Sequence, residues 1–434
     1  MAFESFDQVI QYMNSFMNLE RSTDKYSAKT YRLDRVRKML ELLGNPQDSY
    51  KTIHVAGSKG KGSTAAFIAN AIQALGYRTG LYMSPHVSDY RERFSMCGKF
   101  FEDSLLISTA EQMKNGIRDV EDPTTFELYT VFAFLLFKNA GCDWAVIETG
   151  MGGRLDATNV LLPQACVLTP VELEHTKILG DTIEKIATEK SKIIKKDVPV
   201  FVSYQKEEAM KVFINESSEN NCPVYCLEKE LEKIATRCTV RGQYVQLRYT
   251  DGFEAGLRLE MTGDAQAYNA ALALLVIRKL GLYSEGTTEK ALEETKLPGR
   301  LERIEYKKRN FYLDGAHTVN SVGLLTGSWK EMTDGRKGIC IFGCVEGKND
   351  SQMLSILLPC FGNIVISRPG TFKKSDPEAL FEKAKSISED CKVVLMEEAR
   401  NAVDYAVENS KEGDCILVCG SFYLAGDIKE VLCH

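Results

Sequence analysis

The segment 51–63, Lys-Thr-Ile-His-Val-Ala-Gly-Ser-Lys-Gly-Lys-Gly-Ser, places a short β-branched run directly before a glycine-rich turn. An apolar helical pattern follows at once, which predicts the order strand, loop, helix. The glycines at 57, 60 and 62 let backbone N–H groups approach phosphate oxygens, and Lys61 supplies a positive charge. Gly57 and Lys61 are one residue closer than in the common phosphate-loop pattern. The segment predicts nucleotide phosphate binding rather than an ordinary strand-to-helix turn.

The rest of the sequence has an ordinary globular composition. Its 434 residues predict two or three domains, and 44% hydrophobic with 26% charged residues are typical of a soluble protein. The 13 cysteines lie mostly in apolar runs, which favours buried thiols in a reducing cytoplasm. The first residues lack a signal-peptide pattern, and no apolar run is long enough to cross a bilayer. The net charge of −6 argues against general nucleic-acid binding.

Short apolar runs alternate with helical patterns, which predicts an α/β fold with a mostly parallel sheet. In the first part of the chain, we expect strands at 52–56, 79–83, 144–148, 166–169 and 198–202. Residues 225–260 instead alternate between polar and apolar, with a hairpin turn at Asp251-Gly252. This pattern predicts a small antiparallel patch within the first domain.

A second domain is expected after the segment 296–300, Lys-Leu-Pro-Gly-Arg, which follows a predicted helix at 265–280 and has the composition of a hinge. The alternation then restarts, with strands expected at 311–313, 338–342, 363–367, 393–396 and 415–419. We therefore divide the chain into a nucleotide-binding domain, residues 1–297, and a smaller Rossmann-like α/β domain, residues 298–434.

Several polar side chains follow predicted strands, at the sheet edge where ligands collect in α/β proteins. Glu148 ends a buried-type run and enters a glycine-rich segment, so it is a candidate Mg²⁺ ligand, although pairing with an arginine is an equally good interpretation. His175 and Ser84 follow neighbouring strands and would complete such a site, but a lone loop histidine is usually solvated. Asp314 and His317 follow a strand of the second domain, where they indicate either a nucleotide contact or a simple turn.

Lys190 lies on the apolar stripe of a predicted helix at 182–195, among Ile183, Ile186 and Ile194. A lysine in this position usually extends along the margin of the core toward solvent. Alternatively, it is paired with an acid or chemically modified beside a functional site. A carbamylated lysine would present two oxygens, which suits a second Mg²⁺.

These motifs, in this order, resemble the Mur ligase superfamily and, within it, the folylpolyglutamate synthase/dihydrofolate synthase family. The most specific run is 148–159, Glu-Thr-Gly-Met-Gly-Gly-Arg-Leu-Asp-Ala-Thr-Asn. The other matching motifs extend the resemblance over nearly the whole chain, and they lie at 54–64, 84–86, 92–93, 125–127, 174–176, 179–180, 186–190, 298–302 and 313–317.

The resemblance implies an ATP-dependent ligase that forms an amide bond. In such enzymes, Mg²⁺ and ATP convert a carboxylate of a pteridine substrate into an acyl phosphate, which the α-amine of L-glutamate then attacks. The substrate would be dihydropteroate, a reduced folate or both, so the implied activity is that of a dihydrofolate synthase, a folylpolyglutamate synthase or a bifunctional enzyme. Charge neutralisation and positioning would supply most of the catalysis.

Carried onto matching positions, the resemblance also implies roles for individual residues. Those expected to bind ATP are Ser58, Lys59, Gly60, Lys61, Gly62, Ser63, Asn269, Arg300 and Asp314. Those expected to bind two Mg²⁺ ions, beside a monovalent cation, are Ser84, Glu148, His175 and a carbamylated Lys190. Those expected to face the pteridine are Phe126, Leu155, Asp156 and Ala157. Catalysis would depend on Lys61, Lys190 and His317, the last lying near the reacting carboxylate and glutamate.

Some positions depart from the family pattern. Ser58-Lys59 stands where Thr-Asn is usual, Glu174 stands where Asp is usual, and the segment 18–30 is longer and more polar, so no pterin contact is transferred to it. The alternatives are another Mur-superfamily ligase with a different acid acceptor and a non-catalytic nucleotide-binding homologue. Another Mur-superfamily ligase normally requires an additional N-terminal domain, and only about fifty residues precede the phosphate loop here. A non-catalytic homologue tends to lose its metal ligands or the reactive lysine, whereas Glu148, His175 and Lys190 are all present. We expect a monomer, while the preferred pteridine and the number and linkage of added glutamates stay open.

Overall fold

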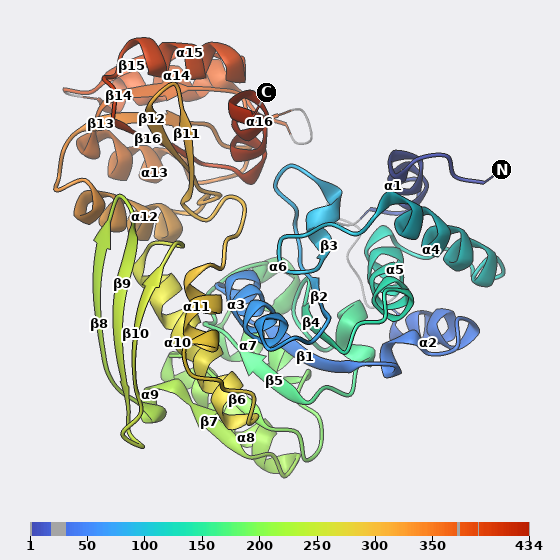
Figure 1. Cartoon of the computed structure of the whole chain (residues 1–434). Helices are drawn as coiled ribbons and strands as arrows, with labels where there is room; N and C mark the ends of the chain where they lie inside the picture. Colours follow the sequence, from blue (N-terminus) through green and yellow to red (C-terminus); the bar gives the residue numbers. More distant parts are fainter. Residues whose placement is uncertain (1, 19–31, 371–373, 389, 434) are drawn as a thin grey trace.

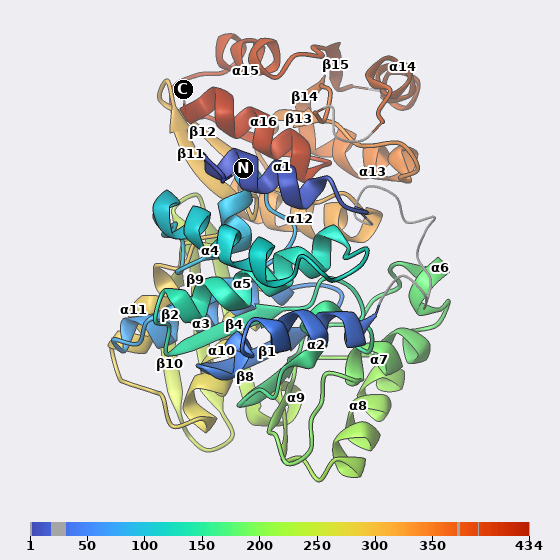
Figure 2. The ribbon, with the colours of Figure 1, turned by 90° about the vertical axis from the view of Figure 1, so that its right-hand side faces the viewer.

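The computed structural model describes residues 2–18, 32–370, 374–388 and 390–433. The polar segment 18–30 singled out in the sequence therefore lies, apart from Asn18, outside the described residues. Within the described ranges, every helix is too short or too polar to cross a membrane. The described residues form three sheets. The sheet of the N-terminal part and the sheet of the C-terminal part lie one above the other (Figures 1 and 2).

The first sheet has seven strands in the order β3-β2-β4-β1-β5-β6-β7. Their bounds are β1 Lys51–Ala56, β2 Thr79–Tyr82, β3 Phe94–Ser95, β4 Trp144–Glu148, β5 Ala165–Leu168, β6 Val200–Val202 and β7 Val224–Cys226. All neighbours pair in parallel except β3, which is antiparallel to β2 at the edge. The predicted parallel strands are confirmed within a residue or two. Strand β1 lies between β4 and β5, so the loops after these three strands meet at one edge.

Helices cover both faces of this sheet, because its strands are apolar on both sides. On one face lie α3 Lys61–Ala74, α10 Asp264–Lys279 and α11 Thr287–Glu293. The other face carries α1 Phe6–Asn14, α2 Leu33–Leu42, α4 Asp103–Gly116 and α5 Thr125–Asn139, together with α7 Ile183–Ser191 and α8 Glu207–Glu219 over β5 and β6. The remaining short helices are η2 Pro46–Asp48, η3 Tyr90–Arg93, η4 Ala157–Val160, α6 Thr176–Leu179 and α9 Leu227–Glu230.

The predicted antiparallel patch is a three-stranded sheet of β8 Leu231–Thr239, β9 Gly242–Tyr249 and β10 Glu254–Leu259. Its turn is at Gly252, as predicted, with φ at +83°. The other end of the patch reaches the C-terminal part of the chain, where the Tyr312 hydroxyl donates to the Val240 carbonyl at 2.8 Å. Figure 1 shows these strands rising beside α10 to α12 Val319–Met332. The patch is therefore a second connection between the two parts of the chain, besides the covalent one.

The C-terminal sheet has six strands in the order β11-β12-β16-β13-β14-β15. Their bounds are β11 Glu302–Tyr306, β12 Arg309–Leu313, β13 Gly338–Phe342, β14 Phe361–Ile366, β15 Lys392–Leu395 and β16 Cys415–Cys419. The covering helices are α12, α13 Asp350–Leu357, η5 Leu358–Cys360 and α14 Pro377–Ile387 on one face, and α15 Ala399–Glu408 and α16 Phe422–Cys433 on the other. Strand β11 is antiparallel and lies at the edge of the sheet. It was not predicted, because charged residues alternate along it and it lacks a continuous apolar run.

The helix that carries Lys190 is shorter than predicted. It ends at Ser191 instead of 195, because the chain turns there to bury Ile193 and Ile194 before it enters β6. The inward orientation of Lys190 is confirmed, since its side chain is only 1% exposed. The position of the lysine thus follows from the helical period even though the helix boundary was misplaced.

A buried ion pair holds α2 against the start of α5. The Arg35 guanidinium donates to both carboxylate oxygens of Glu127, at 2.9 and 2.8 Å, and both side chains are largely buried. We expect Arg35→Leu to lower the free energy of unfolding by about 3 kcal/mol, because it leaves the Glu127 carboxylate buried without its cation. Urea denaturation would measure this change. The control is Lys185→Leu, which removes an exposed pair with Asp181 and should leave the midpoint unchanged. Equal midpoints for the two variants would contradict the expectation.

Candidate active site

The phosphate loop joins β1 to α3 in a conformation that requires glycine at two positions. Gly57 and Gly60 have φ of +154° and +78°, and a Cβ on them would lie 1.9 Å from Thr169 Oγ1 and 2.4 Å from Asn269 Oδ1. The first intrahelical bond of α3 runs from the Thr64 N–H to the Gly60 carbonyl. The amides at the start of this 14-residue helix therefore have no helical acceptor and can bind an anion.

Ser58 and Lys59 bind to the chain that follows β5 through hydrogen bonds within the protein. Their backbone N–H groups both donate to the Pro170 carbonyl, at 2.8 and 3.2 Å, and the Ser58 hydroxyl donates to the Glu172 carbonyl at 3.1 Å. These bonds fix the loop against the chain that follows β5. The Lys59 side chain stays half-buried, and burial lowers its pKa despite the nearby Glu172 and Glu174. Lys59 can therefore reach a phosphate with its side chain but not with its amide.

Glu148 lies at the end of β4, directly beside the start of α3. Its carboxylate is 3.8 Å from Lys61 Nζ and accepts a hydrogen bond from the Ser84 N–H at 3.1 Å. Burial raises the pKa of Glu148, while Lys61 and the Ser84 amide oppose this rise. The structure therefore brings together Lys61, Ser84 and Glu148, three residues that the sequence had placed at one site.

Lys190 lies directly under the phosphate loop. Its ammonium group donates to the Gly57 carbonyl at 2.7 Å and to Glu174 Oε1 at 2.8 Å. Burial lowers the pKa of Lys190 to about 8, although Glu174 opposes this change. Burial alone would raise the pKa of Glu174, but Lys190 and Lys61 outweigh it and lower that pKa to about 2. The sequence interpretation of a paired lysine beside a functional site fits this geometry.

His175 is the first residue before α6 and has a left-handed backbone with φ of +46°. Its side chain is exposed, and Glu174, Lys190 and Lys61 all act on it electrostatically. His175 thus lies on the loop beside Lys190. Among the described residues, no group of three or more histidine, cysteine, aspartate or glutamate side chains is arranged to bind a metal by itself. Any metal here would take further ligands from hydroxyl groups, water or a bound phosphate.

A cavity of about 360 Å³ adjoins the phosphate loop. The residues that line it include Lys59, Gly60, Tyr204, Tyr268 and Asn269. The two tyrosine rings are 5.1 Å apart and nearly perpendicular, and the Asn269 amide donates to Gln266 Oε1 at 3.2 Å. Asn269 therefore lines the cavity directly beside Gly60.

The C-terminal part of the chain contributes a second group of side chains, collected around Phe422. The Arg300 guanidinium lies 4.5 Å from the centre of this ring, and the His317 ring lies 6.0 Å from it. Asp314 accepts from the Leu301 and Ala316 amides at 3.0 and 2.8 Å, which fixes the hinge segment to the end of β12. Burial, together with Lys348, lowers the pKa of His317 to about 4, so its imidazole is neutral at neutral pH.

The two groups of side chains face one another across the junction of the domains. The Asn320 amide on α12 donates to Glu172 Oε1 at 2.7 Å, and Arg300 interacts electrostatically with Glu148 and Asp314. Sequence reasoning missed Phe422 and Asn320. The signal for Phe422 was the Gly420-Ser421 pair after the last strand, and Asn320 follows the His317 motif directly.

The residues expected to face a pteridine lie behind the glycine-rich segment that follows β4. Phe126 is 8% exposed and packs on Gly150, where a Cβ would lie 2.3 Å from its ring. Asp156 is 2% exposed, and its carboxylate accepts from the Met151 and Thr158 amides at 2.9 and 3.0 Å. Ala157 is buried and Leu155 half-buried. Asp156 therefore stabilises the loop 151–158 through hydrogen bonds to its backbone. Of the four residues expected to face the pteridine, Leu155 is the most exposed.

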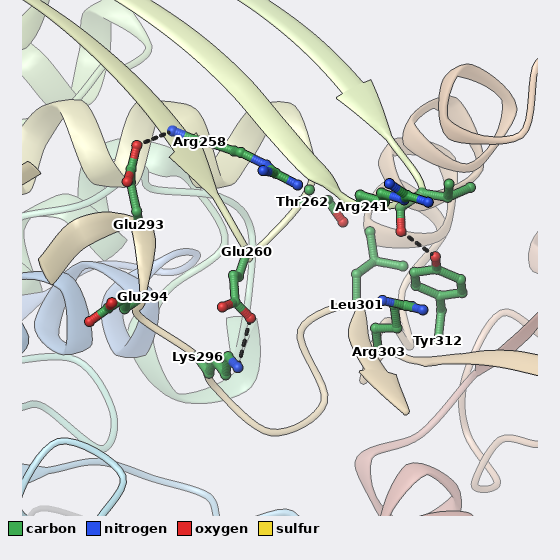
Figure 3. A pocket seen from close by; sticks show the side chains of 12 residues that line it. Arg241, Arg258, Glu260, Thr262, Glu293, Glu294, Lys296, Leu301, Arg303 and Tyr312 are labelled. Atoms are coloured by element: carbon green, nitrogen blue, oxygen red, sulfur yellow. Dashed lines mark hydrogen bonds and ion pairs between the residues drawn. The ribbon is translucent and has the colours of Figure 1, made fainter. Parts of the chain in front are cut away.

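A larger cavity, of about 530 Å³, lies away from these residues. It is bounded by β9 and β10, the hinge segment and β11, and its lining includes Arg258, Glu260, Lys296 and Arg303 (Figure 3). Lys296 pairs with Glu260 at 2.8 Å, and Glu293 accepts from the Arg258 amide at 2.7 Å. Its walls are mixed in charge, and none of the predicted site residues lines it.

Two family models match separate parts of this chain. The Mur ligase middle domain matches residues 55–277, and the glutamate ligase domain of Mur ligases matches residues 299–422. The dihydrofolate synthase/folylpolyglutamate synthase of Bacillus subtilis is 29% identical over 413 residues, which cover 92% of this chain and 94% of that protein. The protein of the same name from Mycobacterium tuberculosis is 30% identical over 86% of this chain and 82% of its own length.

Solved structures extend the similarity to the whole fold. Folylpolyglutamate synthase of Thermotoga maritima has a TM-score of 0.85 at 30% identity, over 99% of this chain and 96% of that one. That of M. tuberculosis, complexed with ADP and AMPPCP, has a TM-score of 0.87 at 28% identity, over 99% and 98% of the two chains. Escherichia coli FolC in complex with DHPP and ADP has a TM-score of 0.83 at 25% identity, over 99% and 97%. The chain therefore belongs to the folylpolyglutamate synthase/dihydrofolate synthase family of ATP-dependent Mur ligases.

Proposed function

We propose that this ligase uses ATP to activate the carboxylate of a pteridine substrate, dihydropteroate or a reduced folate, and joins L-glutamate to it. The observation that carries the proposal is the junction of the two domains. There, Lys61 and Glu148 beside the phosphate loop face Arg300 and His317 across a boundary that the Asn320–Glu172 hydrogen bond spans. Relatives solved with ADP, AMPPCP and DHPP support these classes of ligand.

The proposed reaction has two steps. An oxygen of the substrate carboxylate attacks the γ-phosphorus of ATP, and the bond from this phosphorus to the bridging oxygen breaks to release ADP. The amine of glutamate then attacks the acyl carbon, the amine loses a proton, and phosphate leaves. The start of α3, Lys61 and Lys59 would stabilise the phosphate charge, and Arg300 would approach it from the other domain. The cavity lined by Tyr204, Tyr268 and Asn269 is the proposed place for the nucleotide base.

His317 is the proposed contact for the incoming amine. Its Nδ1 lies 2.7 Å from the Gly315 carbonyl, which can only accept, so Nδ1 carries the proton. Its Nε2 is then a neutral acceptor, suited to orient an amine N–H toward the acyl carbon. Asp314, tied to the hinge, would hold the nucleotide from the same side.

We propose Glu148 as the principal ligand of Mg²⁺, with Ser84 and His175 as further contacts. The chemistry of the donors fits, because Mg²⁺ typically binds one or two carboxylates together with substrate phosphates, and Glu148 presents a buried carboxylate beside the phosphate loop. When bound, the ion would neutralise phosphate charge. A second Mg²⁺ at a carbamylated Lys190 and a monovalent cation belong to the same proposal.

Carbamylation of Lys190 is supported by its pKa of about 8, because the reaction with carbon dioxide requires a neutral amine. The unmodified ammonium group donates to the Gly57 carbonyl and to Glu174. A carbamate would place its oxygens against these two acceptors, so a cation must bind or Glu174 must turn away. Modification and cation binding at Lys190 are therefore coupled.

The remaining assignments complete the proposal. The pteridine would contact Phe126, Leu155 and the chain at Ala157, with Asp156 supporting the loop from behind. We place the domain boundary between residues 297 and 298, inside the hinge that joins α11 to β11. We further propose a monomer that acts in the cytoplasm on small molecules.

The first test measures phosphate release that depends on ATP and L-glutamate, with 7,8-dihydropteroate and tetrahydrofolate assayed in parallel. Turnover of dihydropteroate alone would define a dihydrofolate synthase, turnover of tetrahydrofolate alone a folylpolyglutamate synthase, and turnover of both a bifunctional enzyme. Each of these outcomes supports the proposal. Nucleotide binding without turnover of either substrate would contradict it.

Glu148→Gln tests the proposed metal ligand. The amide keeps the size of the side chain but removes the negative charge, so we expect turnover at millimolar Mg²⁺ to fall by about 100-fold or more. Raising the Mg²⁺ concentration should restore part of the loss, because a weaker ligand set is filled at higher ion concentration. Glu184→Gln, an exposed residue on α7, is the matched control. Turnover of Glu148→Gln equal to that of the control would exclude a metal-binding role.

Lys190→Ala tests the lysine under the loop. We expect a collapse of turnover with a nearly unchanged unfolding midpoint, because the partner Glu174 is partly exposed and can be hydrated. Lys185→Ala, an exposed lysine on the same helix, should behave as wild type. Activity of Lys190→Ala within twofold of wild type would rule out a role at the metal. A carbamate signal in ¹³C NMR, obtained with labelled bicarbonate and lost in Lys190→Ala, would establish the modification directly.

A further inference from the structure

His54 is a buried polar residue in the middle of the first sheet. It lies on β1 opposite Ile147 of β4 and Cys166 of β5, and its side chain is fully buried. The neighbouring Ile53 and Val55 are apolar, as the core of a parallel sheet requires. A histidine in such a place needs a polar partner, and the structure supplies one from the loop that follows β4.

A short chain of hydrogen bonds runs from His54 to this loop. His54 Nε2 lies 2.8 Å from Thr158 Oγ1, and the Thr158 hydroxyl in turn donates to Asp156 Oδ1 at 2.5 Å. The Asp156 carboxylate also accepts from the Met151 amide at 2.9 Å and from the Thr158 amide at 3.0 Å. All three side chains are at most 2% exposed. The chain therefore joins the centre of β1 to both ends of the loop 151–158.

The direction of these bonds follows from the number of protons. Thr158 has one hydroxyl proton, which it gives to Asp156, so the bond between His54 and Thr158 must use a proton on His54 Nε2. His54 Nδ1 is then a bare acceptor, and no partner for it exists among the described residues. Burial, with Lys195, lowers the pKa of His54 to about 3, which keeps the ring neutral. His54 is therefore a fixed donor and does not shuttle protons.

We propose that His54 is a positioning residue, which fixes the position of the loop 151–158 relative to the phosphate loop through Thr158 and Asp156. Strand β1 ends at Ala56 and enters the phosphate loop at Gly57, only three residues after His54. The loop 151–158 carries Leu155 and Ala157. One strand thus holds both the γ-phosphate site and the surface against which the carboxylate substrate lies. The inference rests on the proposed function, because it assigns the pteridine to this loop.

This relative position matters because phosphoryl transfer to a carboxylate depends on distance and alignment. A displacement of about 1 Å between two bound reactants costs about 100-fold in rate. A histidine that served only the core would gain nothing from its unpartnered Nδ1, since a buried polar atom without a hydrogen bond destabilises the folded state. Replacement of His54 by an apolar residue should therefore preserve the fold while it releases the loop.

The test compares two variants, His54→Gln and His54→Asn, whose side-chain amides differ only in the length of the side chain. In His54→Gln, the amide nitrogen can take the place of Nε2 and donate to Thr158, whereas in His54→Asn it falls short of the threonine. We expect His54→Asn to raise the KM of the pteridine that wild type turns over by about 10-fold or more and to lower kcat. His54→Gln should stay within threefold of wild type in both. The dissociation constant of ATP, measured without pteridine, should be unchanged in both variants.

Thr158→Val removes the hydroxyl and should reproduce His54→Asn, and the double variant should be no worse than Thr158→Val alone, since both changes break one chain. Hydrogen exchange gives a readout that needs no substrate. The amides of Met151 and Thr158 should exchange faster in His54→Asn than in His54→Gln, at equal unfolding midpoints. This readout separates failure of the inference from failure of the proposed function. Equal exchange and equal KM in the two amide variants would overturn the inference, as would a parallel loss of ATP binding.

Discussion

The burial of one ammonium group constrains the whole nucleotide side of the site. Lys190 is removed from water beneath the phosphate loop, and a charge in that position is tolerated only when hydrogen bonds replace its hydration. The Gly57 carbonyl and Glu174 provide these bonds. The first belongs to the loop after β1 and the second to the segment after β5, so the lysine on α7 ties two strand ends together. The phosphate loop is consequently held from below before any ligand binds.

The second constraint is that the residues of the proposed site are divided between two sheets. The first sheet contributes the phosphate loop, Lys61 and Glu148, and the C-terminal sheet contributes Arg300, Asp314 and His317. Several contacts besides the hinge hold these parts together, among them the Asn320–Glu172 bond and the bonds that join the three-stranded sheet to Tyr312 and to Glu331. Polar contacts of this kind fit a junction that must admit three substrates, because they can be exchanged for contacts to ligands at little cost.

Most of the fold could be predicted from local patterns. The apolar runs of β1, β4 and β5 and the glycine-rich turn after β1 are strong signals, since a parallel strand buried on both faces needs a continuous apolar run. The elements that were missed or misplaced lack such a signal. Strand β11 is an edge strand of alternating charged residues, and the end of α7 is set by the burial of Ile193 and Ile194 rather than by a helix-breaking residue. Contacts between site residues that are distant in sequence, such as Arg300 and Phe422, also cannot be predicted from the spacing of residues along the chain.

By itself, the sequence determined which residue types stand at the ends of the strands, and with them the family and the phosphate loop. It also determined that Lys190 points inward, because the helical period fixes the direction of a side chain relative to its neighbours. Only the tertiary structure decided what each polar group meets. In the tertiary structure, the Ser58 and Lys59 amides donate to the Pro170 carbonyl. The buried Asp156 carboxylate stabilises its own loop, and His54 is connected to it through the Thr158 hydroxyl. The physical reason is that a hydrogen bond requires two atoms to lie about 3 Å apart in space, and the separation of their residues along the chain does not determine that distance.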